Sequence, residues 1–66
     1  MKIRVNGEER EVEAQANVAG LVADLDFRPE QVAVELNRML VPRAKRDATP
    51  LNEGDEIELV TLVGGG

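Results

Sequence analysis

Apolar and polar residues alternate at the start of the chain. Met1, Ile3 and Val5 are apolar and are separated by single basic residues, a period of two that is typical of a half-buried β-strand. Asn6-Gly7 follows, and both residues tolerate the positive φ angles of a two-residue hairpin turn. Residues 8–14 contain four glutamates, which we interpret as a wetted strand that discourages pairing with another sheet rather than as a metal site. The chain is therefore predicted to open with a β-hairpin.

The spacing then changes to that of a helix. Apolar residues occur at positions 18, 21, 22 and 25, which places them on one stripe of an α-helix. Asn17 precedes this stripe and is a suitable N-cap, whereas Gly20 weakens the helix by up to about 1 kcal/mol relative to alanine. So short a helix is not stable alone in water, and we expect its apolar stripe to pack on a sheet.

The second half of the chain predicts three more strands. Residues 32–36 alternate again, and Asn37-Arg38 is read as a tight turn into a short strand at 39–41, which Pro42 ends because it cannot donate to a ladder. Residues 43–50 are irregular and polar, and 57–63 are the most apolar strand. The order β-β-α-β-β-β predicts an α+β fold: a mixed sheet of four to five strands with one main helix on one face.

The length of the chain fits a single small domain. A chain of 66 residues buries only about 60% of its unfolded surface, so its core is small. We expect residues 1–63 to form the domain and 64–66 to be a flexible glycine tail. Most of the predicted core is aliphatic: Ile3, Val5, Val12, Val18, Leu21, Val22, Leu25, Val34, Leu36, Leu51, Ile57 and Leu59.

The composition excludes most catalytic chemistry. The sequence has no Cys and no His, which removes disulfides, a thiolate nucleophile, the usual zinc ligands and an imidazole base. Thr49 and Thr61 are the only side-chain hydroxyls, and no base that would activate them is evident. The chain is therefore predicted not to be an enzyme with an active site of its own, and to bind no cofactor or metal.

Charge and apolar content narrow the class of partner. A net charge of −5 disfavours nucleic acid, and Phe27 as the only aromatic residue offers no stacking platform. No signal or membrane-spanning segment is evident, so we expect no membrane partner and a cytoplasmic location.

Four basic residues cluster within positions 38–46. They are predicted to be a solvated loop, with a rim contact to an acidic partner as the alternative. They are Arg38, Arg43, Lys45 and Arg46.

The last strand leads directly into three glycines. Gly64, Gly65 and Gly66 pack nothing, but without side chains they suit a tail that presents a carboxylate inside a narrow cleft. Alternation from the core places Val60 and Leu62 on the uncovered face of the sheet, where we predict a partner-docking patch. The alternative is that both are ordinary surface aliphatics.

These segments together resemble a known family. The Asn-Gly hairpin, Leu-Val-Ala-Asp-Leu, Val-Ala-Val-Glu-Leu-Asn, Val-Pro-Arg, Gly-Asp-Glu-Ile-Glu-Leu and a terminal Gly-Gly occur in the order seen in ThiS, the sulfur carrier of thiamine biosynthesis. The resemblance implies a ubiquitin-like β-grasp fold. The family's functional glycine pair maps onto Gly65 and Gly66, and Gly64 is a mild departure from the usual small residue.

The resemblance also implies a function. An E1-like adenylyltransferase of the ThiF type would use ATP and Mg²⁺ to adenylate the Gly66 carboxylate. Sulfur from a persulfide protein would convert it to a thiocarboxylate, the sulfur donor for a thiazole synthase of the ThiG type. Two alternatives stay open: a carrier similar to the small subunit of molybdopterin synthase, and a ubiquitin-like binding module whose tail is inert.

Overall fold

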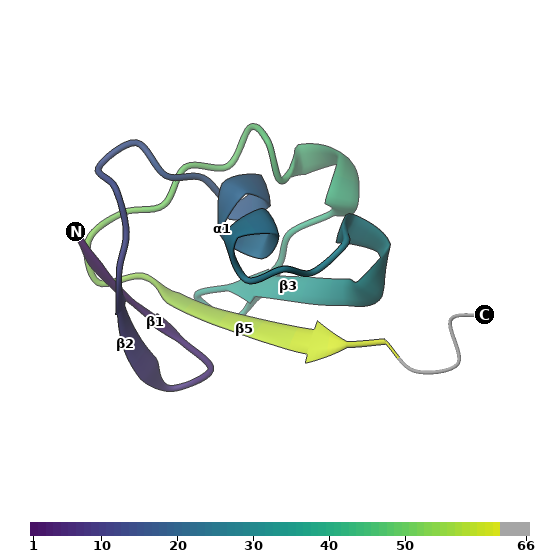
Figure 1. Ribbon diagram of the computed structural model, residues 1–66, viewed down its shortest axis with the longest axis horizontal. Helices are drawn as coiled ribbons and strands as arrows, with labels where there is room; N and C mark the ends of the chain where they lie inside the picture. Colours follow the sequence, from purple (N-terminus) through teal and green to yellow (C-terminus); the bar gives the residue numbers. More distant parts are fainter. Residues whose placement is uncertain (63–66) are drawn as a thin grey trace.

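Five strands form one mixed sheet, and an α-helix lies across one of its faces (Figure 1). The computed structural model describes residues 1–62. The strands are β1 (Lys2–Val5), β2 (Glu8–Glu11), β3 (Val32–Leu36), β4 (Met39–Leu40) and β5 (Glu56–Thr61), and the helix is α1 (Val18–Asp24). Two short 3₁₀ helices, η1 (Pro29–Gln31) and η2 (Arg43–Lys45), were not predicted. The predicted order and the single helix on one face are confirmed, whereas the proposed boundary between residues 63 and 64 lies outside the described residues.

The N-terminal hairpin forms as its turn residues predict. Asn6 and Gly7 have φ angles of 51° and 85°, the left-handed conformation that a tight hairpin turn requires. The register pairs Lys2 with Glu11 and Arg4 with Glu9, so basic and acidic side chains face each other across the strands. The return strand is shorter than predicted, because β2 ends at Glu11.

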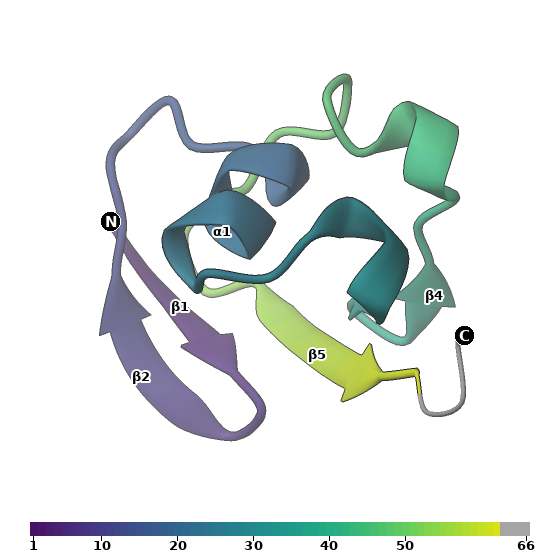
Figure 2. The same cartoon turned by 45° about the vertical axis from the view of Figure 1, so that its right-hand side comes forward.

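Strand β5 lies in the middle of the sheet. The spatial order is β2-β1-β5-β3-β4, with β5 parallel to β1 and antiparallel to β3. Figure 2 shows β5 between the N-terminal hairpin and the strands that follow α1. Strand β5 is paired on both sides only near its start, where Glu56 and Ile57 lie beside β1. Its later residues are held by β3 and by the Asn6 side chain, which bonds the Leu59 backbone.

The helix begins at the predicted cap. The Asn17 Oδ1 atom accepts a hydrogen bond of 2.7 Å from the backbone N–H of Gly20, which satisfies one of the free donors in the first turn. A Cβ atom on Gly20 would lie 3.1 Å from that oxygen, so the glycine leaves room for the cap. The buried side of α1 consists of Val18, Leu21 and Val22, as the spacing predicts.

The core between α1 and the sheet differs from the predicted one at its margins. Val5, Val12, Leu25 and Leu36 are only partly buried and pack against the core rather than within it. Val41 was not expected in the core, but it follows β4, turns inward and donates its N–H to the Val34 oxygen at 2.9 Å. The ten buried aliphatic residues are Ile3, Val18, Leu21, Val22, Val32, Val34, Val41, Leu51, Ile57 and Leu59.

A membrane-spanning helix is absent from the part of the chain that the structure describes.

Candidate functional site

The two faces of β5 have opposite characters. Ile57 and Leu59 are 1% and 9% exposed and belong to the core, whereas Val60 and Leu62 are 56% and 53% exposed. The alternation of a strand produces this division, and the predicted orientation of Val60 and Leu62 agrees with it. Their docking role stays a prediction. Gly64, Gly65 and Gly66, the other candidate site residues, lie outside the described residues.

The end of β5 is tied to the segment that precedes β3. Thr61 is paired with Val32, and the backbone N–H of Leu62 donates to the Gln31 oxygen at 2.8 Å. Leu62 is the last residue that the structure describes. The junction between η1 and β3 therefore fixes where the chain leaves the sheet.

Arg46 holds the same junction, contrary to the prediction that it is part of a solvated loop. It is only 5% exposed. Its Nη1 donates to the Pro29 oxygen at 2.9 Å and its Nη2 to the Val32 oxygen at 2.7 Å. Arg46 thus binds the carbonyls on both sides of Gln31. Burial, and to a lesser degree the nearby Arg43 guanidinium, lowers the pKa of Arg46 below its ordinary value.

No pattern in the sequence indicates this role of Arg46. The residue stands among other basic residues, and its acceptors are backbone oxygens 14 and 17 positions away in the chain. Such contacts exist only once η1, β3 and η2 have come together. Its Nε atom is buried and has no hydrogen-bond partner among the described residues, so the guanidinium is fixed by two of its three nitrogens.

A groove of about 250 Å³ lies beside this junction. Its walls include Ala33, Leu40, Arg43, Arg46 and Leu62. Leu40 is 65% exposed and was not predicted as a site residue. Leu40 is paired with Glu35, and both lie on the face of the sheet away from α1. A prediction of the β3–β4 register would therefore have identified Leu40 as an exposed residue.

We call Leu40, Val60 and Leu62 the apolar patch. These three residues are exposed large aliphatics from β4, β5 and the residue after β5. Exposed aliphatic groups that gather at one place on a small domain are typical of an interaction surface. The patch lies next to the point where the chain leaves the sheet, so a partner covering the patch would also meet the residues that follow Leu62.

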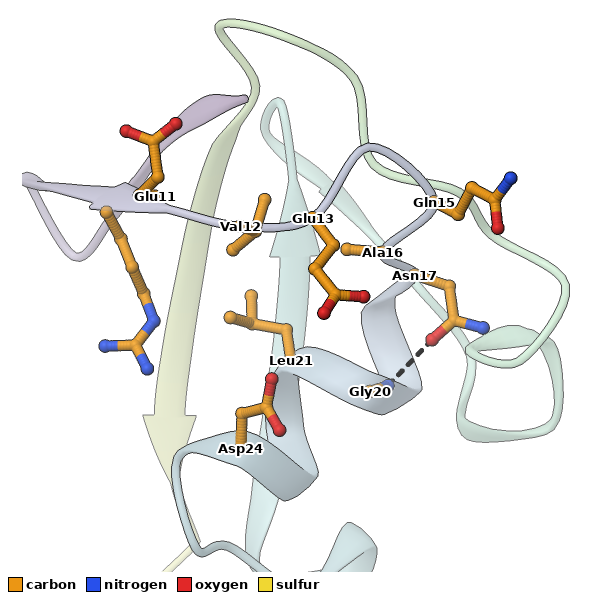
Figure 3. Close-up of a pocket in the computed structure, with 10 residues that line it drawn as sticks. Glu11, Val12, Glu13, Gln15, Ala16, Asn17, Gly20, Leu21 and Asp24 are labelled. Carbon is orange, nitrogen blue, oxygen red and sulfur yellow. Dashed lines mark hydrogen bonds between the residues drawn. The ribbon is translucent and has the colours of Figure 1, made fainter.

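Another hollow lies away from this junction, between the end of β2 and α1 (Figure 3). It has a volume of about 610 Å³, and Glu11, Glu13 and Asp24 are among the residues that line it. Residues 1–62 contain no group of three or more His, Cys, Asp or Glu that would hold a metal ion. This hollow shares no residue with β5 or the apolar patch, and we assign it no function.

Comparison with known proteins gives similar sequences and structures over the whole chain. A thiazole synthase from Magnetococcus marinus is 47% identical over 66 residues, which are 100% of this chain and 20% of that protein. A thiazole synthase from Paramagnetospirillum magneticum is 39% identical over the same length and coverage. The chain thus spans about a fifth of the length of these two relatives.

A solved structure resembles the fold closely. The crystal structure of the thiamine biosynthesis protein ThiS from Geobacter metallireducens superposes with a TM-score of 0.85 at 36% sequence identity, covering 100% of both chains. The likeness confirms the predicted β-grasp arrangement, a mixed sheet grasping one helix. The ThiS family itself matches residues 3–66, a range that includes the apolar patch and the three terminal glycines. The chain belongs to the ThiS family.

Proposed function

We propose that this chain is a sulfur carrier in thiamine biosynthesis and acts as a protein co-substrate in the cytoplasm, with no active site of its own. The observation that carries the proposal is the family match over residues 3–66, which includes Gly65 and Gly66. The match to ThiS favours this carrier over the molybdopterin-type alternative. The exposed apolar patch beside the end of β5 supports it, because a carrier must present its end to other proteins.

The proposed chemistry begins at the Gly66 α-carboxylate. A C-terminal carboxyl group has a pKa of about 3.3–3.7 and is ionised at neutral pH, and a carboxylate carbon resists nucleophiles. An E1-like adenylyltransferase of the ThiF type activates the carboxylate: a carboxylate oxygen attacks the α-phosphorus of ATP, which forms the acyl-adenylate and releases pyrophosphate. Mg²⁺ and basic groups of that enzyme would stabilise the phosphoryl charge. The carrier itself needs only a tail slim enough to enter the enzyme, which glycines provide.

Sulfur enters in the next step. The terminal sulfur of a persulfide on a donor protein attacks the acyl carbon and displaces AMP, which leaves the carrier joined to the donor by an acyl disulfide. A thiol then attacks the donor-side sulfur, so that a protein disulfide forms and the thiocarboxylate of Gly66 is released. These steps require no side chain of the carrier.

A thiazole synthase is the proposed acceptor of this sulfur. Two relatives that contain a segment similar to this entire chain are named thiazole synthase, which supports a functional link between the segment and that enzyme. We infer that this chain meets a ThiG-type synthase through the apolar patch while its tail delivers the thiocarboxylate.

Intact-mass measurement tests the proposal. We expect the chain, co-expressed with a ThiF-type adenylyltransferase and a persulfide donor, to gain the mass that replaces one oxygen by sulfur. A protein with one alanine appended after Gly66 should gain no such mass and should support no ATP–pyrophosphate exchange, because the reacting carboxylate is displaced. Exchange at the unextended rate in the extended protein would contradict the assignment of Gly66. An unchanged mass of the original chain with an active partner would favour the inert-tail alternative.

A further inference from the structure

Two carboxylates face each other at the centre of the uncovered side of the sheet. The β3–β5 register places Glu35 directly opposite Glu58, and the β3–β4 register places Leu40 on the other side of Glu35. Both glutamates are exposed: Glu58 lies between buried Ile57 and Leu59, and Glu35 lies between buried Val34 and partly buried Leu36. Across β4, β3 and β5, the neighbouring residues in this row are therefore Leu40, Glu35 and Glu58.

This arrangement opposes the stability of the free domain. Like charges directly opposite on neighbouring strands repel each other. The ion pairs within 4 Å among residues 1–62 involve Glu11 and Glu30, so neither Glu35 nor Glu58 has a basic partner at that distance. Glu56, by contrast, lies opposite Arg4. Among the described residues the acidic pair therefore makes no ion pair, although Arg4 and Arg38 line the same hollow.

The surroundings of the pair favour an incoming cation. Glu35, Glu56 and Glu58 line a hollow of about 220 Å³ together with Arg4 and Arg38, which leaves one negative charge in excess. Gly7 lines the same hollow and contributes no side chain. The hollow can therefore accept a long basic side chain, whose ammonium or guanidinium would restore the charge balance between the two carboxylates.

The acidic pair is continuous with the apolar patch. Leu40 is paired with Glu35, and Val60 follows Glu58 by two residues on the same face of β5, where it is paired with Ala33. Protein interfaces commonly combine an apolar centre with a polar rim, and charge-assisted hydrogen bonds are stronger than neutral ones. A single partner surface would cover both.

We infer that Glu35 and Glu58 form an acidic contact point that receives a lysine or arginine of the thiazole synthase, beside the apolar patch. The inference rests on the proposed function, and it names the synthase because similar segments occur within two proteins of that name. The basic group pairs with both carboxylates at once, which relieves their repulsion. Binding therefore gains an ion pair to Glu35 and Glu58 that the free domain does not make.

Paired substitutions test the inference. The variant Glu35→Gln/Glu58→Gln keeps the shapes of both side chains and removes both charges. We expect its Kd for a ThiG-type synthase, measured by titration calorimetry, to rise about tenfold or more. The dependence of that Kd on salt concentration should become shallower, and the melting temperature of the free variant should rise by a few degrees.

A matched control removes the same charge elsewhere. Glu13→Gln/Asp24→Asn alters two exposed acidic residues, one in the loop after β2 and one at the end of α1, away from the patch and from the hollow around Glu35, and should leave the Kd within about twofold of the original. Equal Kd values for the original chain and the Glu35→Gln/Glu58→Gln variant would overturn the inference. So would equal weakening by both double variants, since it would indicate net charge alone.

The outcome is separable from that of the proposed function. Thiocarboxylate formation on the original chain tests the carrier function and does not depend on Glu35 or Glu58. If the double variant is thiocarboxylated normally and also binds the synthase normally, only the acidic contact point is wrong. Weakened binding to the adenylyltransferase with unchanged binding to the synthase would also overturn it, because the basic group would then belong to the other enzyme.

Discussion

Arg43 and Arg46 are three positions apart, yet only one of them holds the fold together. Arg46 is buried and donates to two backbone oxygens, whereas Arg43 is exposed. Hydrogen bonds from a charged group contribute about 1.5–3 kcal/mol each when buried, and solvated ones contribute far less. The same residue type therefore has two roles within a single turn of chain.

Replacement of Arg46 tests this difference. We expect Arg46→Met to lower the free energy of unfolding by about 2–4 kcal/mol, because the Pro29 and Val32 oxygens lose their donor. Arg46→Lys should recover only part of the loss, since one ammonium cannot reproduce the planar fork. Arg43→Met is the control and should change stability by less than about 0.5 kcal/mol. Urea unfolding of the three variants provides the comparison. Equal losses for Arg43→Met and Arg46→Met would show that the two Arg46 hydrogen bonds do not stabilise the fold.

The terminal glycines differ in how much change they should tolerate. In the proposed adenylation the last two residues enter the partner's cleft, and Gly64 lies nearer its mouth. A methyl group is therefore expected to obstruct the reaction more at Gly65 than at Gly64. The measurement is the rate of thiocarboxylate formation for Gly64→Ala and Gly65→Ala, with the original chain as reference. An equal or larger loss at Gly64 would show that this ordering is wrong.

At the scale of elements, local signals in the sequence were reliable guides. The Asn6-Gly7 turn, the Asn17 cap and the alternation of 32–36 each depend on residues close together in the chain, and the structure confirms all three. Asn37 and Arg38 form the second tight turn with φ angles of 50° and 71°, again as predicted. Such signals fix most of the elements before any long-range contact forms.

What the sequence could not provide depends on contacts between distant elements. The inward position of Val41, beside Val34, and the outward position of Leu40, opposite Glu35, are partial exceptions, because the register set by the Asn37-Arg38 turn would have predicted both. The burial of Arg46 depends on η1 and η2, two 3₁₀ turns that carry no strong periodicity. The candidate site was therefore predicted correctly for Val60 and Leu62 in their exposure, and incompletely for the residues around them.

At the scale of the whole molecule, one helix covers one face of a five-stranded sheet (Figure 1). The covered face holds the apolar residues that stabilise the fold, and the other face carries charged residues and the apolar patch. A small domain has few apolar residues to spare, so aliphatic groups kept on the open side weaken solubility without adding to the core. Their retention is understandable if a partner covers them.

Two substitutions in and after β5 separate these roles. Leu62→Asp should weaken binding to the adenylyltransferase and to the thiazole synthase about tenfold or more, and should leave the melting temperature nearly unchanged, because Leu62 is already exposed. Leu59→Asp should unfold the domain, since an unpaired buried carboxylate costs several kcal/mol against a total stability of about 5–15 kcal/mol.

Met39→Asp, at an exposed residue outside the apolar patch, is the control for added charge and should affect neither property. Thermal melts and binding titrations on the three variants decide the matter. If Leu62→Asp melts as early as Leu59→Asp, Leu62 supports the core, and if Met39→Asp weakens binding equally, charge rather than the patch governs docking.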